Sequence, residues 1–198
     1  MKKLVLKTIA VTVAAIIALT AAIYLTLALF FPKTLAGAWK DVGSYSLSAK
    51  YYERQYDKSG DTEDLATLCV NLDEKADSAR TAKYLKILTE DEKFSERCAF
   101  EDKQGGFKYT AYEYYYGKYA VAEFYANKID AAITVAKKAV SAGYTEHNAF
   151  YVLLGEETLT KSDGEKIAAA ITEIKGGLTD AAQKSYAERD IGFANGLQ

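Results

Sequence analysis

The sequence predicts an all-α protein, and three observations on its 198 residues carry that prediction. Proline occurs once, at Pro32, where average usage would give roughly ten. Beyond Pro32, Ala, Lys, Glu and Tyr dominate and Val, Ile and Thr are sparse, which argues against the short β-branched strands of a sandwich or barrel. Apolar residues instead recur every three or four positions between glycines, a spacing typical of amphipathic helices.

The first expected element is an uncharged segment from Thr8 to Phe31, preceded by three lysines. As a helix rising ~1.5 Å per residue it is about 36 Å long, enough to cross a bilayer core of ~30 Å. We therefore expect a short tail at residues 1–7, a transmembrane helix in contact with lipid at 8–31, and a body at 32–198. A cleaved signal peptide with a loose site at Ala36-Gly37-Ala38 is the alternative, although signal cores are usually about 7–15 residues long. A buried helix of a soluble protein is the third interpretation.

The lysines around this segment predict its orientation. Lys2, Lys3 and Lys7 precede it, while Lys33 and Lys40 are the lysines that follow closely. The positive-inside rule then places the amino terminus in the cytoplasm. The body is expected on the extracytoplasmic side of the membrane.

Glycines and polar clusters divide the body into ten expected helices. Pro32 suits the first turn of the first one, and Gly43 and Ser59-Gly60-Asp61 mark helix ends and caps. Asp102 to Gly106 is the clearest loop and a possible division of the body. Short loops imply antiparallel neighbours, and helices of this length need partners for their apolar stripes, so we expect stacked helical hairpins. The expected helices cover residues 32–42, 44–58, 62–72, 75–88, 90–101, 107–126, 129–142, 146–154, 164–175 and 179–190.

Each expected helix has its own apolar positions. The stripe of 44–58 is spaced by 4, 3 and 4 residues, and the helix at 129–142 is the most clearly amphipathic. The residues of four stripes are Tyr45, Ala49, Tyr52 and Tyr56; Leu65, Leu68, Cys69 and Leu72; Ala79, Ala82, Leu85 and Leu88; and Ile129, Ala132, Ile133, Ala136, Ala139 and Val140.

Two segments carry a recurring pattern of glycine, aromatic and small residues. The first opens at Gly43-Ser44-Tyr45 and continues with Ser48 and Tyr52, with Gln55 replacing the last small residue. In the second, Asn127 stands in for glycine, as asparagine does in left-handed backbone. Its remaining residues are Ile129, Ala132, Ala136 and Ala139, and Tyr116-Gly117 followed by Ala120 precedes it.

These patterns resemble the tetratricopeptide repeat, over about residues 33–58 and 107–143. The segments that open at Gly43 and at Asn127 resemble the second helix of the repeat. Tyr116-Gly117 with Ala120 resembles the first helix of the repeat. The resemblance implies a right-handed helical array whose concave face binds peptides or proteins. The helices from Gly164 onward would then be the polar cap that such arrays need.

Seven tyrosines crowd the expected helix at 107–126, and two interpretations stay open. One is packing against the flanking helices, and the other is an aromatic binding surface. By the repeat resemblance, Tyr114 and Lys118 would face the groove, and they are our first candidates for partner binding. The seven are Tyr109, Tyr112, Tyr114, Tyr115, Tyr116, Tyr119 and Tyr125.

The two cysteines, Cys69 and Cys98, have two interpretations. Cys69 lies on an apolar stripe, where a buried thiol is expected. Outside the cytoplasm a disulfide between the two is the alternative. With one histidine in the chain, a zinc site built from these cysteines is improbable.

Candidates for catalysis are few. His147, the sole histidine, falls at the start of an expected helix with Thr145 as its cap, so we expect a structural or solvated role. Asp61, Glu63 and Asp64, like the pair Glu156-Glu157, lie at helix ends, where acids favour the helix dipole or are solvated. The chain carries no phosphate-binding glycine loop, nucleophile elbow or metal-ligand helix motif. We expect no catalytic residue, metal site or cofactor.

These observations favour binding over chemistry. Charges beyond Phe31 are interspersed and net negative, which argues against nucleic-acid binding. The leading hypothesis is a single-pass membrane scaffold or adaptor that binds a protein or peptide partner of the membrane or envelope. The alternative is an envelope-associated hydrolase or sugar-binding accessory protein with a carboxylate cleft. A secreted, mainly structural helical domain is the third hypothesis.

Overall fold

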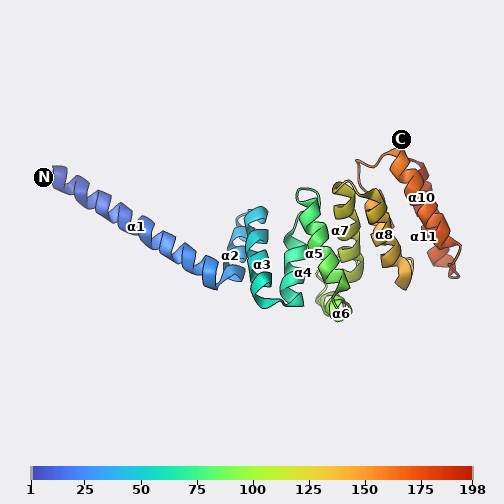
Figure 1. The fold of residues 1–198 in the computed structure, drawn as a ribbon, viewed down its shortest axis with the longest axis horizontal. Coiled ribbons are helices and arrows are strands. Elements are labelled where there is room, and N and C mark those ends of the chain that lie inside the picture. The colour runs from blue at the N-terminus through green and yellow to red at the C-terminus, as the bar shows by residue number, and fades with distance from the viewer. Residues whose placement is uncertain (1, 198) are drawn as a thin grey trace. The chain divides into compact units, whose positions relative to one another are not determined.

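The computed structural model describes residues 2–197, and every regular element within them is a helix (Figure 1). This confirms the all-α prediction. Met1, at the start of the expected tail, and Gln198 lie outside the described residues. The elements are α1 (Lys2–Phe30), α2 (Pro32–Asp41), α3 (Tyr45–Ser59), α4 (Thr62–Asn71), α5 (Ser78–Glu90), α6 (Phe94–Gln104), α7 (Ala111–Tyr125), α8 (Ile129–Ala139), the 3₁₀ turn η1 (Val140–Ala142), α9 (Ala149–Leu154), α10 (Lys161–Lys175) and α11 (Ala181–Asn195).

Helix α1 is the long apolar helix that the sequence predicts. Its stretch Val5–Phe30, 26 residues, is long and apolar enough to cross a membrane. Large apolar side chains such as Leu6, Ile16 and Leu25 are exposed along it. Residues 2–7, which we expected to be a separate tail, are helical and continuous with the rest of α1.

The chain divides into two compact units, one ending at Asn71 and the other beginning at Leu72. In the N-terminal unit α2 packs against α3, and α3 packs against α4. Pro32 begins α2 as a first-turn residue, as predicted. The buried core of these three helices consists of Leu35, Ala36, Ala49, Tyr51, Tyr52, Leu65, Ala66, Leu68 and Cys69.

The C-terminal unit contains two rows of packed helices. Helix α7 contacts α5 before it and α9 after it, and α9 also contacts α11. A second row contains α8 and α10, and α8 contacts α7 while α10 contacts α11. Helices α5, α7, α8 and α9 therefore each touch the helix two places further along the chain, while α7 also pairs with α8 and α10 with α11. This arrangement is compatible with a helical solenoid.

Buried aromatic residues of α6 and α7 form the centre of the C-terminal unit. The ring of Phe94 lies 5.9 Å from those of both Tyr115 and Tyr116. Tyr115 is fully buried, and Tyr116 and Tyr119 are nearly so. The Tyr115 hydroxyl donates to the carboxylate of Glu101 at 3.0 Å. For these three tyrosines the packing interpretation is confirmed.

Helix ends show where local sequence signals succeeded and failed. Asn127 adopts the left-handed conformation that we predicted, with φ of 60°. The expected loop at 102–106 is largely helical, because α6 continues to Gln104 and ends at Gly105 with φ of 66°.

The cap of α9 differs from our prediction. Asn148, rather than Thr145, accepts hydrogen bonds from the amides of Phe150 and Tyr151. Thr145 instead donates to Glu113, the acid in the capping box of α7. The asparagine lies where the backbone first turns helical, so its short side chain reaches the free amides.

Candidate functional site

A cavity of about 470 Å³ opens on the C-terminal unit between α9, α11 and the segment that precedes α7. We call it the aromatic groove. Its lining residues are Tyr109, Tyr151, Val152, Leu154, Gly155 and Phe193. The Phe193 side chain is 53% exposed although it is large and apolar. An apolar concave surface of this size can receive one or two side chains of a ligand.

Stacked rings build one wall of the groove. The imidazole of His147 stacks on Tyr109 with ring centroids 3.8 Å apart, and it meets Tyr151 edge-on at 5.6 Å. The Arg189 guanidinium lies over the Tyr151 ring, 4.4 Å from its centroid. His147 is therefore packed into this wall, and the structural or solvated role expected for it stays a prediction.

A buried polar cluster holds Arg189 in place. Asp190 is fully buried, and one of its oxygens accepts from the Tyr144 hydroxyl at 2.8 Å and from Asn148 at 3.1 Å. Its other oxygen accepts from Arg189 Nε at 2.8 Å, and Arg189 also donates to the carbonyl of Glu146. Burial, reinforced by the nearby Asp190 carboxylate, raises the pKa of Tyr144 far above its usual value. The cluster ties α11 to the start of α9.

A glycine of α7 brings α9 close enough to form the groove. A Cβ at Gly117 would lie 3.0 Å from the side chain of Val152. Gly117 belongs to the Tyr116-Gly117 pattern in the sequence, where small residues allow helices to approach closely. A Cβ at this position would require the Val152 side chain to shift by a few tenths of an ångström.

The two predicted partner-binding residues lie elsewhere on the C-terminal unit. Lys118 is buried, with a side chain 8% exposed, and forms an ion pair with Glu74 at 2.8 Å. Tyr114 is half-buried and stacks on Phe107 with centroids 4.3 Å apart. The structure brings the two together, with Lys118 Nζ 6.0 Å from the Tyr114 centroid. Their role in partner binding stays a prediction.

Both cysteines are buried thiols in the structure. Cys69 lies on α4 of the N-terminal unit, and Cys98 lies on α6 of the C-terminal unit. Burial, with a smaller effect of the Glu101 carboxylate, raises the pKa of the Cys98 thiol to about 12. The thiol of Cys98 is consequently a poor nucleophile in the folded protein. The disulfide between the two cysteines stays a prediction.

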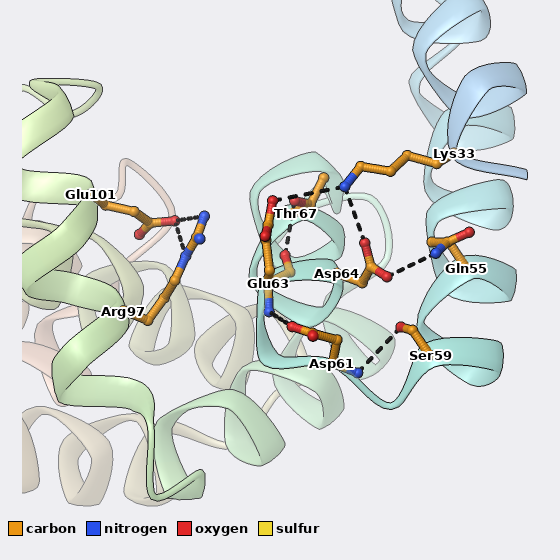
Figure 2. A network of polar contacts seen from close by, with 9 residues as sticks. All are labelled: Lys33, Gln55, Ser59, Asp61, Glu63, Asp64, Thr67, Arg97 and Glu101. Carbon is orange, nitrogen blue, oxygen red and sulfur yellow. Dashed lines mark hydrogen bonds and ion pairs between the residues drawn. The ribbon is translucent and has the colours of Figure 1, made fainter.

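The acids at the start of α4 are engaged within the N-terminal unit (Figure 2). Asp61 caps the helix by accepting from the Glu63 amide at 2.7 Å. Asp64 accepts from Lys33 at 3.3 Å and from Gln55 at 2.9 Å. Burial alone would raise the pKa of Asp64, but hydrogen bonds from Ser59, Gln55 and Lys33 hold it below its usual value. Figure 2 shows Lys33 reaching from the start of α2 to both Glu63 and Asp64.

In the second acidic pair, Glu156 is also partnered. Glu156 accepts from the Tyr125 hydroxyl at 2.8 Å and forms an ion pair with Lys75 at the same distance. The hydrogen bond from Lys75 to Glu156 raises the pKa of that lysine. Among residues 2–197, no three His, Cys, Asp or Glu side chains gather closely enough to hold a metal ion.

Sequence reasoning missed most of the aromatic groove. Its residues come from α9, α11 and the segment before α7, which are far apart in the chain, and Phe193 lies beyond the end that we expected for the last helix. The one local signal was the spacing of His147 and Tyr151, four residues apart. No protein-family profile, curated protein or solved structure matches this chain.

Proposed function

We propose that this protein is a membrane-anchored scaffold that binds a protein or peptide partner on the extracytoplasmic side of the membrane. Helix α1 is its anchor, and the C-terminal unit is a tetratricopeptide-like array without catalysis of its own. The aromatic groove is the observation that carries the proposal. It offers a partner an exposed phenylalanine between rigid helices and a wall of stacked rings.

The packing of the C-terminal unit supports the repeat-like interpretation. Helices α5, α7, α9 and α11 contact one another in succession, as the first helices of stacked hairpins would. Gly117 lets α7 and α9 approach closely at the position where the repeat pattern has a small residue. The groove opens beside this row and uses residues of α9 and α11.

The groove suits a segment that carries an apolar or aromatic side chain. Tyrosine and phenylalanine provide a large contact area at a low cost in conformational entropy. The Asp190 cluster fixes Arg189 and, through it, the Tyr151 ring, so the wall is preorganised. Anchoring raises the local concentration of membrane partners, so modest affinity in the groove suffices.

A photo-crosslinking amino acid in place of Phe193 tests the proposal. We expect a discrete adduct with a partner protein in the cells that make this protein. The matched control carries the same crosslinker at Phe100 on α6, which is also 53% exposed but does not line the groove. Equal adducts at both positions, or none at Phe193, would contradict the groove as the binding site.

A substitution separates binding from folding. Phe193→Asn is expected to abolish capture of the crosslinked partner, now probed from Leu154, which also lines the groove, while the thermal unfolding curve stays unchanged. Phe100→Asn should leave both unchanged. Full capture by the Phe193→Asn variant would show that the partner binds elsewhere, with Tyr114 and Lys118 as the next positions to probe.

A further inference from the structure

The apolar stretch of α1 is longer than a bilayer requires. Val5–Phe30 has 26 residues, whereas a hydrocarbon core of ~30 Å is crossed by about 20. The surplus of about six residues corresponds to ~9 Å of helix at ~1.5 Å per residue. Counted back from Phe30, this surplus begins at Leu25, directly after Tyr24.

The contacts of α1 with α3 begin at Tyr24, the residue before this surplus. The hydroxyl of Tyr24 is hydrogen-bonded to that of Tyr51 on α3, and the two rings meet edge-on with centroids 6.4 Å apart. Ala28 is buried, and the Lys58 ammonium donates to the carbonyl of Leu29. The last turns of α1 therefore pack against α3 as part of a protein structure.

These contacts also give the direction of α3 relative to α1. Lys58 meets α1 at Leu29, and Tyr51, earlier in α3, meets α1 at Tyr24, earlier in α1. Helices α1 and α3 therefore run in the same direction along their contact. From Tyr51, the chain of α3 leads back to its start and to the turn before it. This is the same direction in which α1 runs from Tyr24 into the bilayer.

The side chains on that turn have the chemistry of a membrane interface. Val42 is 71% exposed and Tyr45 is 60% exposed, at the turn between α2 and α3. Trp39, the one tryptophan of the chain, and Lys40 precede them in the last turn of α2. Tryptophan, tyrosine and lysine are the residues that concentrate at the level of lipid headgroups.

We propose that the hydrocarbon boundary falls at Tyr24 and that the α2–α3 turn lies in the headgroup layer, so that the N-terminal unit rests on the bilayer surface. The inference rests on the anchoring role proposed for α1. Phe30, which lies ~9 Å beyond Tyr24 along the helix, is then just outside the headgroup layer, which adds roughly 5–7 Å on each side of the core. The partner of this surface is lipid.

Nitroxide labels on the full chain in phosphatidylcholine vesicles test the inference. Single cysteines replace Ile16 in the span, Val42 at the turn, and Asp57, an exposed residue near the other end of α3. The unsubstituted protein, whose two cysteines are buried, supplies the background. For each label we measure collision with oxygen, which concentrates in lipid, and with a water-soluble nickel chelate.

We expect an oxygen-to-nickel ratio at Val42 that is severalfold higher than at Asp57 and lower than at Ile16. A ratio at Val42 equal to that at Asp57, with Ile16 still protected from nickel, would overturn the inference and leave the anchor intact. Nickel access at Ile16 would overturn the anchor and the inference together. Quenching of Trp39 fluorescence by brominated lipid provides an independent readout, and quenching by aqueous acrylamide alone would contradict the inference.

Discussion

At the scale of single residues, Lys118 shows how a charge is kept inside a helical protein. The aliphatic part of this α7 side chain is buried. Its ammonium forms an ion pair with Glu74 at 2.8 Å and lies near the ring of Tyr114. Glu74 is 30% exposed, so water screens one end of the pair. The arrangement allows a lysine to contribute to packing and to an ion pair at once.

Lys118→Met should destabilise the protein by ~1–3 kcal/mol, because Glu74 loses its partner next to a buried position. We expect the midpoint of thermal unfolding, followed by circular dichroism in mild detergent, to fall by several degrees. Lys86→Met on the exposed face of α5 is the matched control and should leave the midpoint unchanged. An unchanged midpoint for Lys118→Met would show that the ion pair with Glu74 does not stabilise the fold.

Cys98 gives a second prediction at this scale, one that depends on pH. Because burial raises the pKa of its thiol to about 12, little thiolate exists at pH 8. Alkylation of the folded protein should therefore be slow at pH 8 and speed up about tenfold per pH unit toward pH 12. In denaturant without reductant we expect two labels per chain by mass spectrometry. No label under those conditions would establish the disulfide between Cys69 and Cys98.

At the scale of elements, glycines decide how closely the helices of the C-terminal unit approach. A Cβ at Gly164 on α10 would lie 2.4 Å from the carbonyl oxygen of Ala194 on α11. A Cβ at Gly192 on α11 would have no atom within 4 Å. Two glycines of one helix pair thus differ in function, one permitting contact and the other merely weakening its helix.

Gly164→Ala should destabilise the α10–α11 pair by ~1–3 kcal/mol, because the backbone of α11 must move. Gly192→Ala should instead stabilise the protein by ~1 kcal/mol through helix propensity. Hydrogen exchange of α11 amides measures both changes. Slower exchange in Gly164→Ala than in the parent protein would contradict the close approach of the two helices.

At the scale of the whole molecule, the anchor and its orientation are the properties to test. We expect the chain to stay in the membrane fraction after alkaline carbonate washing. Protease added outside intact cells should digest the body, because the lysines at the amino terminus favour the cytoplasm. A mature protein that begins at Trp39 would show that α1 is a cleaved signal, and a protected body would reverse the orientation.

The sequence by itself determined the properties that depend on neighbours along the chain. Apolar periodicity predicted the helices, the absence of charge from Thr8 to Phe31 predicted the long apolar helix, and Asn127 predicted a left-handed helix end. Each is a property of a few consecutive residues. Errors arose where two local signals competed, as with Thr145 and Asn148 before α9.

Only the tertiary structure decided which side chains meet. Lys118 and Glu74 are 44 residues apart, and the aromatic groove joins Tyr109, Tyr151 and Phe193 from three distant segments. Likewise, nothing near Tyr24 in the sequence points to Tyr51, yet their contact marks where α1 leaves the bilayer in our proposal. Helical periodicity says which face of each helix is apolar. It does not say which partner covers that face, because the partner is chosen by packing between distant segments.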